Sequence, residues 1–247
     1  MILALDTDLV VLSIPQADRA DAISEKLPTV AVVVVDCTIR DPMIPDLNTM
    51  GMLLGKDEEA GALIDWIEGY EGIVGERTGD LKLEEMPTFF YGDISERGIS
   101  ASTPGSTRGP VAEGCGGRNI APDLPGKGGT VDAEWLIVQN PDVIFIKPMS
   151  GGTGIGKTEA DMEEMLTAIL ADRPELANIN AVKDHRVYII DYNLLCGPRW
   201  IIANCYFAKW LHPELFGDVD PGEMHREYLS EFHGLELEGT WAYPAPE

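Results

Sequence analysis

The chain has 247 residues, of which 42 are acidic and 18 are basic, so its formal net charge is −24. A surface this anionic repels phosphate backbones, which excludes nucleic acid as the main partner. Hydrophobic residues at 45% and charged residues at 24% are ordinary for a globular protein, so the length allows one large or two small domains with an ample core.

The N-terminal residues predict a β-α-β unit. Residues 7–13 and 29–36 are continuous runs rich in β-branched side chains, which are typical of strands buried on both faces of a parallel sheet. Residues 18–27 carry apolar side chains at helical spacing and end at Pro28. The stretch 37–48 contains prolines and aspartates and is expected to be a connection.

A long helix is predicted over residues 55–81. Leu63, Ile67, Tyr70 and Val74 form a single apolar stripe along it. Acidic residues crowd its first turns, which suits the positive end of the helix dipole.

Strands and helices continue to alternate downstream. Strands are expected at 86–93, 142–148 and 186–191, and helices at 132–140, 158–176, 198–216 and 220–235. The helix at 198–216 is apolar nearly all round, so it should be buried. Residues 94–130 are dominated by Ser, Thr, Gly and Pro, and predict a long loop that is either functional or disordered.

This alternation indicates an α/β fold with a parallel, Rossmann-like sheet. The simplest division has three parts: a partial α/β lobe (1–48), a connecting helix (49–82) and a complete α/β lobe (83–247). Two segments support a repeat between the lobes, because AEWLIVQNPDVIFIK (133–147) aligns with MILALDTDLVVLS (1–13) so that Asp142 stands over Asp8. Each segment has an apolar turn, a polar corner ending in Asp, and a strand.

The chain resembles the substrate-binding proteins of ABC importers, in the subgroup that captures ferric siderophores, haem and cobalamin. The resemblance covers residues 2 to 244. Four segments carry it: AEWLIVQNPDVIFI, GCGGRNIA, ELANINAVKDHRVYIID, and GPRW followed by AKWLHPELFGDVDP. It implies two α/β lobes joined by a rigid helix, and a protein that binds an iron chelate or corrinoid without catalysis or a cofactor.

The resemblance also implies where the protein works and what it meets. Such proteins are periplasmic or extracellular, are membrane-associated in their full-length form, and deliver their ligand to a membrane permease. A glutamate in each lobe docks onto the permease, and Glu134 occupies that place in the second lobe. The resemblance further implies that most of the family's first lobe, and any signal segment, would precede Met1. We therefore expect weak ligand binding by the chain alone, and a homodimer through exposed sheet edges is an alternative state.

Candidate ligand-binding residues follow predicted strands or lie in the long loop. Arg199 and Trp200 begin a helix close to a strand end, where clefts form in open α/β folds and where a planar guanidinium suits carboxylates or iron-bound oxygens. The alternative for Arg199 is an ion pair with one of the many acids. Tyr91 either stacks on a flat macrocycle or packs at the edge of the core. The full candidate set is Tyr91, Arg97, Arg108, Arg118, Ser150, Thr153, Tyr192, Arg199 and Trp200. Arg118 also has a turn-building alternative.

Residues Gly151–Thr158, GGTGIGKT, match the phosphate-loop pattern and lie between a predicted strand and helix. A nucleotide-binding protein is therefore the alternative function. The acids Glu159, Asp161 and Glu163 argue against it, since they crowd the helix end that would meet phosphate. No metal site is expected from the four histidines, and no hydrolase motif is present.

Overall fold

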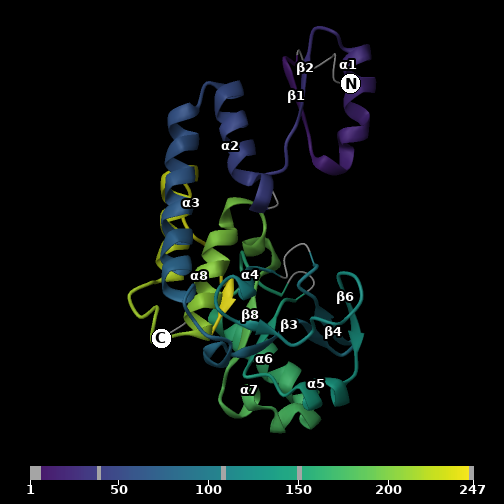
Figure 1. The fold of residues 1–247 in the computed structure, drawn as a ribbon, viewed down its shortest axis with the longest axis vertical. Coiled ribbons are helices and arrows are strands. Elements are labelled where there is room, and N and C mark those ends of the chain that lie inside the picture. The colour runs from purple at the N-terminus through teal and green to yellow at the C-terminus, as the bar shows by residue number, and fades with distance from the viewer. Residues whose placement is uncertain (1–6, 38–39, 107–109, 149–151, 245–247) are drawn as a thin grey trace. The chain divides into compact units, whose positions relative to one another are not determined.

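The computed structural model describes residues 7–37, 40–106, 110–148 and 152–244. The chain divides into two units, Met1–Ile64 and Asp65–Glu247. Helix α3 (Asp57–Thr78) contributes residues to both units (Figure 1).

The first unit contains the predicted β-α-β arrangement. Strands β1 (Leu9–Leu12) and β2 (Ala31–Val34) pair in parallel, with Leu9 opposite Ala31. Between them lie the 3-10 helix η2 (Ile14–Arg19) and α1 (Ala20–Lys26). The β-α-β prediction is confirmed.

The predicted connection over 37–48 is wrong, because most of it belongs to helix α2 (Arg40–Leu54). Pro42 stands in the first turn, where a missing N–H removes no helical hydrogen bond, and Pro45 removes one bond near the start. Gly55 ends the helix with a φ of 63°.

The second unit is built on one sheet with the strand order β6-β4-β3-β7-β8-β9, and β5 pairs with β3. The strands are β3 (Thr88–Ser95), β4 (Gly98–Ser102), β5 (Arg118–Asn119), β6 (Gly128–Val131), β7 (Val143–Ile146), β8 (Val187–Ile190) and β9 (Ala242–Tyr243). Strands β5, β3, β7 and β8 run parallel, and β4, β6 and β9 pair antiparallel to their neighbours. The α/β class with a mostly parallel sheet is confirmed.

The long loop predicted over 94–130 is wrong in part. Strand β3 continues to Ser95 and returns as β4, and β6 pairs with β4 in turn. Ile99 and Ala101 are buried while Ser100 is exposed, so the alternation of a half-buried strand is present within a segment rich in small residues.

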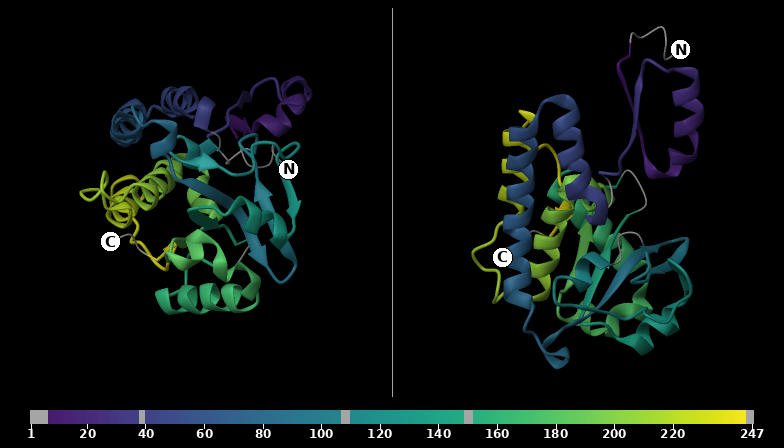
Figure 2. Two further views of the ribbon diagram at one scale, coloured as in Figure 1. Left: turned by 60° about the horizontal axis from the view of Figure 1, so that its bottom comes forward. Right: turned by 45° about the horizontal axis from the view of Figure 1, so that its top comes forward.

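Helices cover both faces of this sheet (Figures 1 and 2). The α-helices are α4 (Pro110–Glu113), α5 (Ala133–Gln139), α6 (Glu159–Ala171), α7 (Asn180–Lys183), α8 (Trp200–Leu211) and α9 (Pro221–His233). The 3-10 helices are η3 (Leu83–Glu85), η4 (Pro174–Asn178), η5 (Tyr192–Leu195) and η6 (Gly197–Arg199). No helix in the described ranges is long and apolar enough to cross a membrane.

Alternate side chains of each central strand enter two different cores. Phe145 on β7 faces α8, with its ring centroid 4.6 Å from that of Phe207. The neighbouring Ile144 packs on the other face, in a cluster with Leu136 of α5 and Met162 of α6. Burial on both faces explains why this strand reads as a continuous apolar run. Every residue of α8 is buried, as its composition predicts.

Candidate functional site

The carboxyl ends of β7 and β8 meet at one edge of the sheet, which is where ligand sites form in open α/β folds. Lys147 directly follows β7, and its Nζ lies 5.1 Å from the ring centroid of Tyr91 and 5.9 Å from that of Tyr192. Tyr192 follows β8 and is 40% exposed. This edge therefore presents a half-buried cation beside an accessible aromatic ring.

Asp191 organises the end of β8. Its buried carboxylate accepts hydrogen bonds from the hydroxyl of Thr153 and, at 2.6 Å, from the backbone N–H of Asn193. Its own N–H donates to the carbonyl oxygen of Trp241 at 2.7 Å. The carboxylate thus ties the loop after β7 to the end of β8.

Arg199 ends η6 and is half-buried. Its Cζ lies 5.6 Å from the ring centroid of Trp241. Among residues 7–37, 40–106, 110–148 and 152–244, no carboxylate forms an ion pair with Arg199, and none of its N–H groups has an acceptor. The alternative role of Arg199, an ion pair with one of the many acids, is therefore not seen among the described residues.

His225 packs under this group. Its ring centroid lies 5.3 Å from that of Trp241, and the residue is 1% exposed. Burial, followed by the positive charge of Arg199, lowers the pKa of His225 to about 4. The imidazole is therefore neutral at pH 7, and the positive charge beside Trp241 comes from Arg199 and not from His225.

The structure brings three of the predicted residues together. Thr153 bonds to Asp191, Tyr192 follows it directly, and Arg199 contacts Trp241, whose backbone is bonded to Asp191. Lys147 and Asp191 were not among the predicted residues, although each lies at the carboxyl end of a predicted strand. Trp241 was also missed, and nothing in its local sequence marks it.

The other predicted residues are buried, lie elsewhere or are not described. Tyr91 and Trp200 are only 2% and 4% exposed, so neither ring offers a face to a ligand in this structure. Arg118 donates from Nε to the carbonyl of Met86 at 3.0 Å, at the amino end of β3 and away from the strand ends described above. Arg108 and Ser150 lie outside the described residues.

Arg97 lies in the turn between β3 and β4 and lines a separate pocket of about 680 Å³. The floor of that pocket is apolar and includes Ile94, Ile146 and Met165. Asp93, Glu96 and Asp172 also line it, so acids outnumber Arg97 there.

The start of α6 argues against the phosphate-loop alternative. Thr158 is the N-cap residue, and its hydroxyl lies 2.7 Å from a carboxylate oxygen of Asp161. That same oxygen accepts the N–H of Thr158 at 2.7 Å, and these bonds lower the pKa of Asp161. A carboxylate therefore occupies the helix end that a phosphate would need. No group of side chains suited to a metal ion occurs among the described residues.

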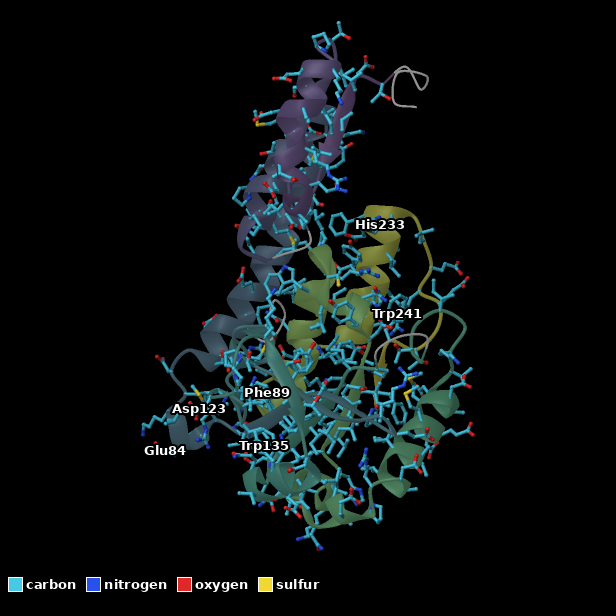
Figure 3. The ribbon with its side chains drawn as sticks, turned by 90° about the vertical axis from the view of Figure 1, so that its right-hand side faces the viewer. Glu84, Phe89, Asp123, Trp135, His233 and Trp241 are labelled. Atoms are coloured by element: carbon cyan, nitrogen blue, oxygen red, sulfur yellow. The ribbon has the colours of Figure 1, made fainter. Side chains whose placement is uncertain are left out.

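Glu134 lies in the first turn of α5 and is exposed, as contact with another protein requires. The helix is fixed at its start by Asp132, whose carboxylate accepts the N–H of Trp135 at 2.7 Å, and at its end by Asn140 in the left-handed conformation. Figure 3 labels Trp135 in this part of the second unit. The Glu134 carboxylate is therefore held on a short, capped helix.

Comparison with known proteins gives one family match. A sequence model described as "Periplasmic binding protein" matches residues 1–194. No curated protein matches the chain.

Solved structures share its fold. The TroA-like periplasmic binding protein FepB from Veillonella parvula is 21% identical with a TM-score of 0.88, over 99% of this chain and 74% of that one. The molybdate-bound protein MolA from Haemophilus influenzae is 19% identical with a TM-score of 0.68, over 96% and 76%. Ni(II)-bound CeuE from Helicobacter pylori is 18% identical with a TM-score of 0.65, over 95% and 71%.

Proposed function

The chain belongs to the periplasmic binding protein family, and we propose that it is the solute-binding component of an ABC importer for an iron chelate or a corrinoid. Its role is then to bind a small molecule outside the cytoplasmic membrane and deliver it to a permease, without catalysis. The similar structures differ in the ligand that their names state: MolA is molybdate-bound, CeuE is Ni(II)-bound, and FepB is named without a ligand. A ligand with an anionic group would suit the cationic side chains of Lys147 and Arg199 at the sheet edge.

One observation carries the proposal: Arg199 lies at the carboxyl edge of the sheet with no acidic partner among the described residues. A guanidinium offers several N–H donors in a planar fork that matches carboxylate, catecholate or phosphate oxygens. Tyr192, 40% exposed, adds an aromatic surface for an organic ligand. We therefore assign Arg199, Tyr192, Thr153 and Lys147 to the ligand site.

The test is a fluorescence titration with haemin, cyanocobalamin, ferric enterobactin and molybdate. We expect one of these probes to bind saturably but weakly. Arg199→Ala should weaken that binding by about 10- to 100-fold, because charge-assisted hydrogen bonds contribute about 1.5–3 kcal/mol. Arg97→Ala is the matched control, since it removes an exposed arginine that is not among the four assigned residues. No binding by any probe, or equal losses in both variants, would refute the proposal.

Glu134 is proposed to present its carboxylate to basic residues of the permease. We expect Glu134→Ala to leave ligand affinity unchanged and to reduce ligand uptake into proteoliposomes that contain the cognate permease. Glu231→Ala on α9 is the control, because it also removes an exposed helical glutamate. Equal uptake with both variants would count against docking through Glu134. Light scattering on the same samples tests the proposed dimer, and a monomer at all concentrations would exclude it.

A further inference from the structure

The C-terminal segment Gly239–Tyr243 is bonded to two sides of the ligand site. Ala242 and Tyr243 form β9 and pair with Ile190 and Ile189 at the end of β8. The carbonyl of Thr240 accepts the N–H of Gly154 at 2.7 Å, from the loop after β7. These bonds fix the segment across the carboxyl edge of the sheet.

The contact with the loop after β7 is close enough to require glycine. Gly239 has a φ of 79°, and a Cβ atom there would lie 2.1 Å from the carbonyl oxygen of Gly154. A side chain would push the two backbones apart. Gly239 thus lets the C-terminal segment approach the loop that carries Thr153.

Trp241 projects from this segment with its ring fixed. Its Nε1 donates to the carbonyl of Glu238 at 2.9 Å, and the ring of His225 packs against it at an interplanar angle of 80°. The guanidinium carbon of Arg199 lies 5.6 Å from the centroid of the indole. Figure 3 shows Trp241 in the C-terminal segment, apart from Trp135 on α5.

This contact orients Arg199 without neutralising it. A cation–π contact uses the electrostatic attraction of the ring, whereas an ion pair would occupy the N–H donors with a carboxylate. Among the residues that the structure describes, no acceptor is bonded to the Arg199 N–H groups. The guanidinium is thus held in place while its hydrogen-bonding capacity remains available.

We infer that Trp241 is a positioning residue for Arg199, and that the segment Gly239–Tyr243 is a fixed wall of the ligand site. The role of Arg199 in ligand binding rests on the proposed function, but its placement by Trp241 does not. The chemistry that this arrangement suits is an anionic group on the ligand, bound by the guanidinium N–H groups beside an apolar indole surface.

The experiment has one arm without ligand and one with it. In the first, proton NMR of the Arg199 side chain is recorded in the wild type, Trp241→Leu, Trp241→Phe and Trp135→Leu. Ring currents should shift the Arg199 δ and ε protons upfield in the wild type and in Trp135→Leu. That shift should be lost in Trp241→Leu and partly kept in Trp241→Phe. Urea unfolding of each variant checks that it is folded.

In the second arm, the four probes of the binding titration are used with the same variants. Trp241→Leu should weaken binding by about 3- to 30-fold, the equivalent of one cation–π contact. Trp241→Phe should recover most of the affinity, and Trp135→Leu should match the wild type. Trp135 is a suitable control because it packs against the core cluster on the other face of the sheet.

The two failures are distinguishable. If no probe binds, the proposed function fails, while the NMR arm still decides the placement of Arg199. Arg199 protons that are unshifted in the wild type, or unchanged in Trp241→Leu, would overturn the inference. So would a probe whose binding depends on Arg199 but is unaffected by Trp241→Leu.

Discussion

Asp142 joins the start of β7 to the start of β3. Removing its carboxylate tests whether this residue of the repeated sequence segment stabilises the pairing of the two strands. One carboxylate oxygen accepts the N–H of Thr88 at 2.9 Å and the Thr88 hydroxyl at 2.6 Å. The Asp142 N–H in turn donates to the Thr88 carbonyl at 3.0 Å. These bonds set which residue of β7 stands beside which residue of β3.

The size of the effect follows from the number and exposure of these bonds. A hydrogen bond to a charged group contributes about 1.5–3 kcal/mol when well buried, and solvent screening reduces this at a half-buried site. We expect Asp142→Ala to lower the free energy of unfolding by about 2 kcal/mol, because it leaves two Thr88 donors without that acceptor. The midpoint of thermal unfolding should fall by about 4–8 °C.

The assay is a double-mutant cycle of Asp142→Ala and Thr88→Val, measured by urea unfolding at pH 7. Thr88→Val removes the hydroxyl but keeps the backbone N–H, so the coupling energy isolates the bond between hydroxyl and carboxylate. We expect a coupling of about 1 kcal/mol. Asp123→Ala removes an exposed aspartate and should change the stability by less than about 0.5 kcal/mol.

The pH dependence has a definite sign. Burial alone would raise the pKa of Asp142, but hydrogen bonds from Thr88 and Asn180 and the charge of Arg186 hold it below 3.8. The unfolded state therefore binds the proton more readily, so the stabilisation is full above about pH 4 and is lost as the pH falls through the folded-state pKa. A coupling below about 0.3 kcal/mol at pH 7, within the error of additivity, would refute this account.

Two further predictions concern the core and the buried histidine. Phe145→Ala should lower the free energy of unfolding by about 3–5 kcal/mol, since Phe145 is fully buried with four aromatic rings around it. Phe145→Leu should lower it by less than half as much. Equal losses of the two variants in urea unfolding would contradict this. His225 should titrate near pH 4 when followed by NMR. Because its pKa in the folded state lies below 6.5, the wild type should lose stability relative to His225→Gln as the pH falls from 6.5 to 4. A titration midpoint near pH 6.5 would contradict the burial argument.

The strands of the central sheet could be predicted because burial on both faces leaves a strong local signal. The segment that forms β7 has no polar residue, and α8 is apolar all round, so each reveals its environment without knowledge of its neighbours. The Asp that precedes β7 was also visible as part of a repeated segment. Its partner Thr88 was not, because the bond joins residues that are distant in the sequence.

The segments that were predicted wrongly depend on partners elsewhere in the chain. Strands β4 and β6 consist mostly of Gly, Ser and Ala, whose intrinsic preference for strands is weak. They form because β3 extends far enough to pair with β4, which in turn pairs with β6. Helix α2 likewise forms despite two prolines near its start.

The sequence by itself determined the α/β class and the family resemblance, because apolar periodicity and short motifs are local properties of the chain. It also led to the proposal that Arg199 binds the ligand. Only the tertiary structure decided that Tyr91 and Trp200 are buried and that Trp241 contacts Arg199. The physical reason is that burial and cation–π contacts depend on which distant segments meet. Strand β9 brings Trp241 to the end of β8, and no local pattern encodes that pairing.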